Sequence, residues 1–186
     1  AGLLVGDELA GAATDEQGLL ALATSMEGHP DNVAAALLGG LVVAAQIGSQ
    51  VVTRRADIPS DLSFIVVTPA RQMSTTRSRA VLPEQYTRSD VVHNLQRVAL
   101  LTACVFSGGF ELRPEFFQDR LHQPQRAPLV PGIAGCLALK HPDLLGVFLS
   151  GAGSSVTAIT RRSADEIAQR LRQQFESAGM PAESRV

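Results

Sequence analysis

The chain has 186 residues, is 45% apolar and carries a formal net charge of −2, with a pI near 6.1. A chain of this length and composition can bury a core and form one large or two small domains. The near-neutral charge offers no broad attraction for nucleic acid or for an anionic membrane surface, so we expect neither as a partner. No apolar run reaches the roughly 18 residues that a membrane span needs.

The first part of the sequence predicts helices over residues 1–10, 19–26 and 31–38. Thr14 and Gln17 have the spacing of a capping box ahead of the second helix. In such a box the Thr14 side chain accepts the backbone N–H three residues on, and the Gln17 side chain accepts the backbone N–H of Thr14. Pro30 suits the first turn of the third helix because it has no N–H to lose there.

Strands are predicted over residues 41–45, 51–52 and 62–68. The segment Arg54 to Ser60 between them is polar and contains a proline, so it is the best candidate for a domain boundary.

The second part of the sequence predicts helices over residues 91–106, 113–122 and 164–178 and strands over residues 146–150 and 156–160. A last strand is expected after Met180-Pro181, which makes an end at Val186 look early. Cys104 and Cys136 have neither a disulfide pattern nor a metal-ligand pattern, and we interpret both as buried thiols.

The run Glu27-Gly28-His29-Pro30-Asp31-Asn32 places an imidazole, two carboxylates and an amide at a predicted helix start. Backbone N–H groups and the helix dipole attract anions at such a position. The alternative is structural: Asp31 and Asn32 would be helix caps, with His29 as a surface neighbour.

A second unusual segment, Phe148-Leu149-Ser150-Gly151-Ala152-Gly153-Ser154-Ser155, is a glycine loop between two apolar strands. Its backbone can approach an anion or another loop closely, although most such glycines mark simple turns. A serine-hydrolase elbow around Ser150 is excluded, because it would need glycine where Phe148 stands.

These two segments resemble the homoserine kinases of the galactokinase, homoserine, mevalonate and phosphomevalonate (GHMP) kinase superfamily, and the resemblance covers nearly the whole chain. It implies an α+β fold, with an incomplete ribosomal-protein-S5 domain-2-like half over residues 1–55 and a ferredoxin-like C-terminal domain over residues 61–186. The family carries its main ATP-phosphate loop, Pro-x-x-x-Gly-Leu-Gly-Ser-Ser-Ala, just upstream of the position of Ala1. We therefore expect an N-terminally truncated fragment that has no kinase activity by itself, because ATP would lack its main anchor.

The resemblance also implies the substrate site, formed by His29, Asp31, Asn32, Arg79 and Arg126. The arginines lie in Ser78-Arg79-Ala80-Val81-Leu82-Pro83 and in His122-Gln123-Pro124-Gln125-Arg126, and a planar guanidinium can bind a carboxylate with two parallel bonds. Singly, each would be an ordinary surface arginine, and Arg77 is a rival for Arg79. Asn94 also falls at a family position, but a core amide bonded to backbone is the more economical interpretation.

ATP and Mg²⁺ are the cofactors that the resemblance implies. Glu27 is its candidate metal ligand, since Mg²⁺ favours hard oxygen atoms. Gly151, Gly153 and Ser154 would form a loop beside the phosphate loop, although Ser154 stands where proline is usual in the family.

The implied reaction transfers the γ-phosphoryl group of ATP to the side-chain hydroxyl of L-homoserine, a step towards threonine, in a cytoplasmic enzyme of a family that often forms homodimers. Phosphoryl transfer needs chiefly positioning and charge neutralisation, so no general base is assigned. Three alternatives stay open: a mevalonate-type sister kinase, a non-catalytic ligand-binding module that lacks the ATP loop, and a plain α+β domain with surface charges. A substrate panel would distinguish a mevalonate-type kinase from a homoserine kinase. The coding sequence upstream of Ala1 would distinguish a non-catalytic module from a truncated kinase.

Overall fold

The computed structural model describes residues 2–71 and 73–186. The chain divides between Ile58 and Pro59 into two compact units, here called unit 1 and unit 2. Each unit has its own buried core and is described by itself. Among the described residues, no helix is both long enough and apolar enough to span a membrane.

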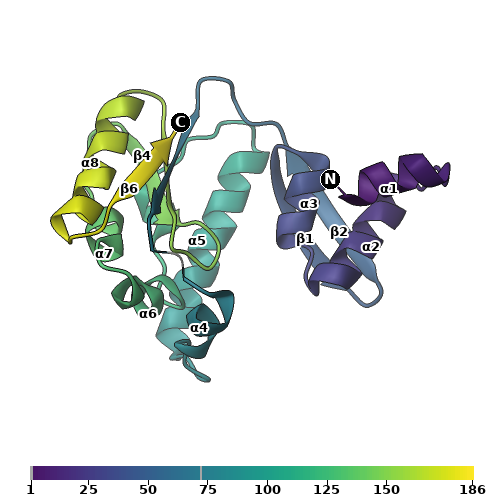
Figure 1. Cartoon of the computed structure of the whole chain (residues 1–186), viewed down its shortest axis with the longest axis horizontal. Coiled ribbons are helices and arrows are strands. Elements are labelled where there is room, and N and C mark those ends of the chain that lie inside the picture. Colours follow the sequence, from purple (N-terminus) through teal and green to yellow (C-terminus); the bar gives the residue numbers. More distant parts are fainter. Residues whose placement is uncertain (1, 72) are drawn as a thin grey trace. The chain divides into compact units, whose positions relative to one another are not determined.

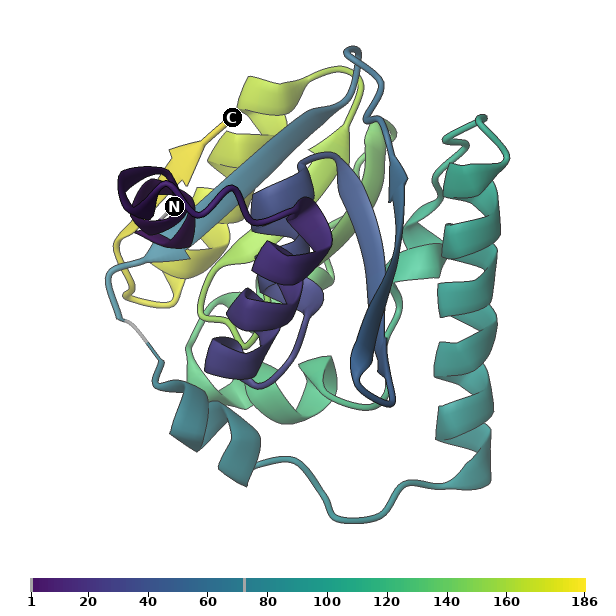
Figure 2. The ribbon, with the colours of Figure 1, turned by 90° about the vertical axis from the view of Figure 1, so that its right-hand side faces the viewer.

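Unit 1 consists of α1 (Gly2–Ala10), α2 (Glu16–Glu27), α3 (Asp31–Leu38), β1 (Leu41–Ile47) and β2 (Gln50–Ala56) (Figure 1). The two strands form an antiparallel hairpin, and Figure 2 shows α2 and α3 beside it. Leu20, Ala34 and Val51 are buried between the helices and the hairpin. The three predicted helices are confirmed, while β2 is longer than predicted because it pairs with β1 along its whole length.

The predicted capping box at the start of α2 is wrong. The N-cap is Asp15, whose carboxylate accepts the backbone N–H of Gly18 at 2.8 Å. An anion is the stronger partner at the positive end of a helix, which explains why Asp15 displaces Thr14. Gln17 does not reach back but donates from Nε2 to the carbonyl of Val51 at 2.9 Å, and so ties α2 to the hairpin.

Unit 2 consists of β3 (Ser63–Pro69), α4 (Thr75–Ala80), α5 (Arg88–Phe106), η1 (Pro114–Phe117), α6 (Gln123–Arg126), η2 (Ala127–Leu129), α7 (Ile133–Leu137), β4 (Leu144–Leu149), β5 (Val156–Thr160), α8 (Ala164–Ser177) and β6 (Ala182–Arg185). The strands form an antiparallel sheet in the order β4-β5-β3-β6, as in a ferredoxin-like domain. The predicted α+β class is confirmed. The strand expected after Met180-Pro181 is present as β6 and pairs with β3.

The core of unit 2 lies between this sheet and α7 and α8, which stand together in Figure 1. Ile167, Leu171 and Phe175 follow one another at four-residue spacing along α8 and are all fully buried. Burying a side chain of this size contributes about 1.5–3 kcal/mol. Cys136 on α7 is buried in the same core, and that burial raises the pKa of its thiol to about 12.

The helix predicted over residues 113–122 is wrong. Only η1 forms, and the chain then turns at Gln118, whose backbone is extended. Asp119 follows and its carboxylate binds the backbone N–H groups of the next residues, which would otherwise be available to an α-helix.

Helix α5 is less buried than its sequence pattern indicated. Of its residues only Val105 is buried, and its exposed apolar side chains are Val91, Val92, Leu95, Val98, Leu100 and Phe106. The prediction that both cysteines are buried is therefore wrong for Cys104, which lies half-buried on this helix. Helix α5 begins at Arg88, after the N-cap Thr87, three residues before the predicted start.

Candidate functional site

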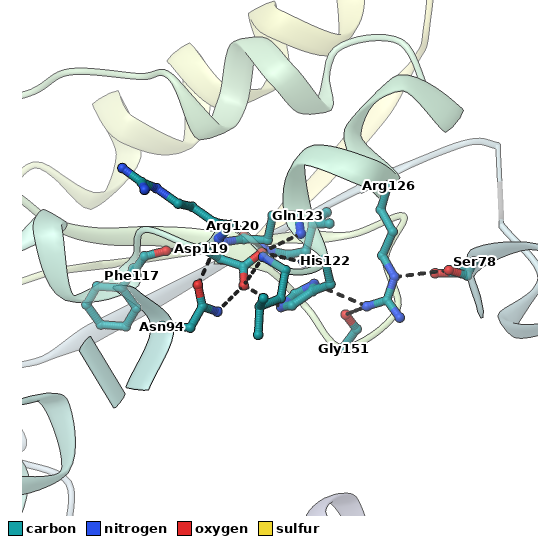
Figure 3. Close-up of polar contacts among 11 residues, drawn as sticks. Ser78, Asn94, Phe117, Asp119, Arg120, His122, Gln123, Arg126 and Gly151 are labelled. Atoms are coloured by element: carbon teal, nitrogen blue, oxygen red, sulfur yellow. Dashed lines mark hydrogen bonds and ion pairs between the residues drawn. The ribbon is translucent and has the colours of Figure 1, made fainter. Parts of the chain in front are cut away.

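The guanidinium of Arg126 joins three parts of unit 2 (Figure 3). Its Nε donates to the carbonyl of Ser78 in α4 at 3.2 Å, and its Nη1 donates to the carbonyl of Gly151 at 3.4 Å and to Nδ1 of His122 at 3.2 Å. All three acceptors are uncharged in this arrangement. Among the described residues no carboxylate forms an ion pair with Arg126, so its positive charge is oriented but not neutralised.

His122 acts as a hydrogen-bond acceptor toward this arginine. Because Nδ1 accepts from Arg126, the ring proton of the neutral imidazole lies on Nε2, which is 3.9 Å from Oδ1 of Asp119. Burial lowers the pKa of His122; the Asp119 carboxylate opposes this effect and the Arg126 charge adds to it. The ring is therefore held in the neutral form that the acceptor role requires.

Asp119 organises the turn that leads into α6. Its carboxylate, 8% exposed, accepts the backbone N–H groups of Leu121 at 3.2 Å and His122 at 2.8 Å, and also those of Gln123 and of the Asn94 amide. Burial acts to raise the pKa of Asp119, but the hydrogen bonds from Gln123, Asn94 and His122 outweigh it and the pKa lies below its ordinary value. The group is an ionised, fully bonded carboxylate.

Two amides fasten this turn to the rest of unit 2. Asn94 on α5 accepts the backbone N–H of Arg120 at 2.9 Å while donating to Asp119. The buried Gln123 donates to the carbonyl of Phe117 at 3.1 Å and accepts the backbone N–H of Leu149 on β4 at 2.7 Å. Asn94 was expected to bond to backbone; it does so, and it also binds a carboxylate.

The glycine loop after β4 is tied to α4. Gly151 and Gly153 have φ values of +55° and +85°, which residues with a Cβ rarely adopt. The Ser78 hydroxyl donates to the carbonyl of Ala152 at 2.8 Å, and Ser154 is buried. The loop carbonyls therefore face Ser78 and Arg126, which brings two of the sequence-predicted segments together.

Arg79, the other predicted arginine, is not part of this contact network. Its side chain is exposed, and no hydrogen bond or ion pair with another described residue involves its guanidinium. Its rival Arg77 is exposed as well, and the Arg77 backbone N–H caps α4 by donating to the Ser74 hydroxyl at 3.2 Å. Both arginines keep their charges free, so the geometry does not choose between them.

The Glu27 to Asn32 motif lies in unit 1, between α2 and α3. His29 contacts Asp31 through Nδ1 and Oδ1, and the same carboxylate oxygen accepts the backbone N–H of Asn32 at 2.7 Å. The side chains of Glu27, Asp31 and Asn32 are exposed and face solvent within this unit. The structural alternative is wrong about the caps, because the N-cap of α3 is Pro30, which makes no side-chain cap bond, and Asp31 and Asn32 lie in the first turn of the helix.

No cluster of three or more His, Cys, Asp or Glu side chains that could enclose a metal ion occurs in the described part of the chain. A metal held by protein ligands alone does not fit this surface. A single exposed carboxylate such as Glu27 fits only a weakly held, largely hydrated ion.

The sequence alone did not identify three of these residues as part of the site, namely Ser78, Asn94 and Asp119. The sequence did contain one signal: an aspartate three residues before His122, with Pro124 in the following turn, is typical of a side chain that caps a short helix. The contact with Asn94 joins residues 25 positions apart, which no local pattern reveals.

Comparisons with known proteins place this geometry in a family. Residues 111–177 match the family model described as GHMP kinases C terminal. The chain is 40% identical over 186 residues to a homoserine kinase of Solibacter usitatus, covering 99% of this chain and 61% of that protein. It is 45% identical over 159 residues to a homoserine kinase of Deinococcus radiodurans, covering 84% of this chain and 51% of that protein.

A crystal structure of homoserine kinase from Cytophaga hutchinsonii superposes with a TM-score of 0.85 at 26% identity, covering 96% of this chain and 59% of that one. The chain thus spans little more than half the length of the relatives that it matches. Asp119, His122, Arg126 and the glycine loop lie within the matched region, whereas Asn94 and Ser78 lie before it. Residues 111–177 therefore form a GHMP kinase C-terminal domain, in a chain that is similar to homoserine kinases over nearly all of its length.

Proposed function

We propose that the protein carrying this chain transfers the γ-phosphoryl group of ATP to the side-chain hydroxyl of L-homoserine, giving O-phospho-L-homoserine and ADP. The observation that carries the proposal is Arg126, a half-buried arginine held by three neutral acceptors in a chain similar to proteins named homoserine kinase. Its uncompensated charge suits the carboxylate of an amino-acid substrate. Residues 1–55 would belong to the N-terminal kinase domain and residues 61–186 to the C-terminal one.

The substrate would be held by His29, Asp31, Asn32, Arg79 and Arg126. Arg126 is oriented by backbone carbonyls, so its free Nη2 edge can bind a carboxylate without reorganisation. Asp31 offers a carboxylate for the substrate ammonium, and His29 is already in contact with it. Positioning of this kind is what phosphoryl transfer chiefly requires, and no residue is assigned as general base.

ATP and Mg²⁺ are the proposed cofactors. Mg²⁺ supplies charge neutralisation on the phosphates when it is bound, and it usually takes one or two protein carboxylates besides phosphate and water. Glu27 is the proposed carboxylate, on the limited ground that it is exposed beside His29. Gly151, Gly153 and Ser154 are proposed to support the phosphate-binding region with a loop whose shape is set by bonds to Ser78 and Arg126. A cytoplasmic location and a homodimer belong to the same proposal.

The experiment that tests this function is a substrate panel on the complete gene product that contains this chain. ADP release would be measured with ATP and Mg²⁺ in the presence of L-homoserine, D-homoserine or R-mevalonate. We expect kcat/KM for L-homoserine to exceed that for R-mevalonate by about 100-fold or more, because a site built for an ammonium group leaves charges unpaired with mevalonate. Preference for R-mevalonate would identify a sister kinase, and homoserine binding without ADP release would identify a non-catalytic module.

A further inference from the structure

The short helix α6 cannot hold Arg126 in place by its own stability. It spans only Gln123–Arg126, and its backbone bonds run from the N–H of Arg126 to the carbonyl of His122 at 3.0 Å and from the N–H of Ala127 to the carbonyl of Gln123. A single isolated turn is far below the length at which a helix is stable in water. The direction in which Arg126 leaves the backbone must therefore be set by what holds the preceding turn.

Asp119 holds that turn. Its carboxylate accepts the consecutive backbone N–H groups of Leu121, His122 and Gln123. N–H groups at the start of a helix such as α6 have no acceptor within the helix. The Asn94 amide fixes the same carboxylate from α5 and also accepts the backbone N–H of Arg120 (Figure 3). Together these bonds order residues 120–123, the turn that leads to Arg126.

The ring of His122 is carried by the same turn. Oδ1 of Asp119 lies 3.9 Å from Nε2, beyond hydrogen-bond distance, while Nδ1 accepts from Arg126 at 3.2 Å. The tautomer with its proton on Nδ1 would present an N–H to the guanidinium, so the contact requires the proton on Nε2. Asp119 acts on this contact through the backbone N–H of His122, which its carboxylate binds at 2.8 Å.

We infer that Asp119 and Asn94 are positioning residues that aim Arg126 at the carboxylate of the substrate. The role in substrate binding rests on the proposed function; the role in ordering Arg126 does not. The polar atoms of both side chains are occupied by protein partners: the Asp119 carboxylate accepts from backbone and amide donors, and the Asn94 amide bonds to Asp119 and to the backbone N–H of Arg120.

The kinetic test compares Asp119→Asn and Asn94→Ala in the complete gene product, with Asp143→Asn as the matched control. Asp143 is also bonded by side chains in unit 2, through the Ser163 hydroxyl at 2.6 Å, but it does not contact the turn. KM for L-homoserine should rise about tenfold in the two test variants, while kcat and KM for ATP change less than about twofold. In an Arg126→Ala background Asp119→Asn should add nothing, and additive losses in that background would overturn the inference.

A second measurement needs no kinase activity. In the 186-residue chain labelled with ¹⁵N, the Nε–H signal of Arg126, identified by its loss in Arg126→Lys, should be shifted and protected from exchange by its bond to Ser78. In Asp119→Asn and Asn94→Ala that signal should move to the position of a free arginine, and it should stay in place in Asp143→Asn. An unchanged signal in both test variants would overturn the inference.

The two measurements also separate the inference from the proposed function. A signal that moves as expected, in a protein that does not phosphorylate L-homoserine, would keep the positioning role and refute the function. We expect both test variants to keep the wild-type circular dichroism spectrum and a melting temperature within about 10 °C of wild type. Unfolding of both variants would make Asp119 a residue of general stability and would also overturn the inference.

Discussion

At the scale of single residues, the notable property of Arg126 is that no carboxylate among the described residues pairs with it. A surface arginine commonly pairs with a carboxylate, as Arg170 does with Glu166 at 2.7 Å, and such exposed pairs contribute little to stability. Arg126 is instead held by two carbonyls and a neutral imidazole. Its orientation is fixed without neutralising its charge, which is the condition for binding an anionic group from outside the protein.

The carboxylate of Asp119 makes a pH-dependent contribution to stability. Because its pKa is lower in the folded than in the unfolded protein, this contribution is complete above the unfolded value of about 4 and is lost as the pH falls through the folded value. We expect Asp119→Asn to lower the free energy of unfolding by about 2 kcal/mol at pH 7. Urea unfolding should show that this difference is constant from pH 7 to pH 5 and shrinks below about pH 4. A difference that stays the same down to pH 3 would contradict the assignment.

The sequence pointed to Arg126 through the resemblance of the segment His122 to Arg126 to the homoserine kinases. It did not point to Asp119 or Asn94 as a pair, since their contact depends on how α5 and η1 come together in the fold. Local spacing carries no information on partners that lie 25 positions apart.

At the scale of elements, helices with a strong pattern agree with prediction and irregular segments do not. Helix α8 was predicted from its periodicity, and its apolar stripe is the stripe that packs on the sheet. The segment 113–122 has helix-forming residues but becomes a short 3₁₀ turn followed by the Asp119 turn. Its side-chain bonds to backbone compete with a helix, and hydrophobic pattern alone cannot weigh that competition.

Gly132, at the start of α7, is required by both backbone conformation and packing. Its φ is +97°, and a Cβ there would lie 2.7 Å from Cα of Phe175. We expect Gly132→Ala to lower the free energy of unfolding by about 3 kcal/mol, from strain in the left-handed region and overpacking against α8. Urea denaturation followed by circular dichroism measures this loss.

Gly109 provides the matched control for that substitution. A Cβ at Gly109 would meet its nearest neighbour, Cγ of Glu111, at an ordinary 3.6 Å. Gly109→Ala should therefore change the free energy of unfolding by less than about 0.5 kcal/mol. Equal effects of the two substitutions would refute the packing explanation for Gly132.

At the scale of the whole molecule, the two units have cores of different size. Unit 1 buries Leu20, Ala34 and Val51 between two helices and a two-stranded hairpin, an arrangement that is marginal by itself. Unit 2 covers a four-stranded sheet with α7 and α8.

Hydrogen exchange should distinguish the two units. We expect backbone amides of β1 and β2 to exchange at least about 100-fold faster than those of β5 and α8, because the smaller core costs less to open. Mass spectrometry of peptides from each unit would measure the difference. Equal protection in the two units would show that they open together, and would refute this account of their cores.

The sequence predicted the α+β class, the antiparallel second half and the family, and all three are confirmed by the fold and the comparisons. The predicted site residues are a different matter. His29 contacts Asp31 in unit 1, and Arg126 joins the glycine loop to α4 in unit 2. That these residues bind one substrate together stays a prediction. Contacts within one unit do not test whether side chains of the two units bind the same molecule.

The most direct measurement of the central claim compares two substrates in wild type and in Arg126→Ala. One substrate is L-homoserine and the other is the analogue in which a hydroxymethyl group replaces the carboxylate. If Arg126 binds the carboxylate, kcat/KM for L-homoserine falls about 100-fold in the variant, while kcat/KM for the analogue changes by no more than about twofold. An equal loss for both substrates, or no loss for L-homoserine, would contradict the claim that Arg126 binds the substrate carboxylate.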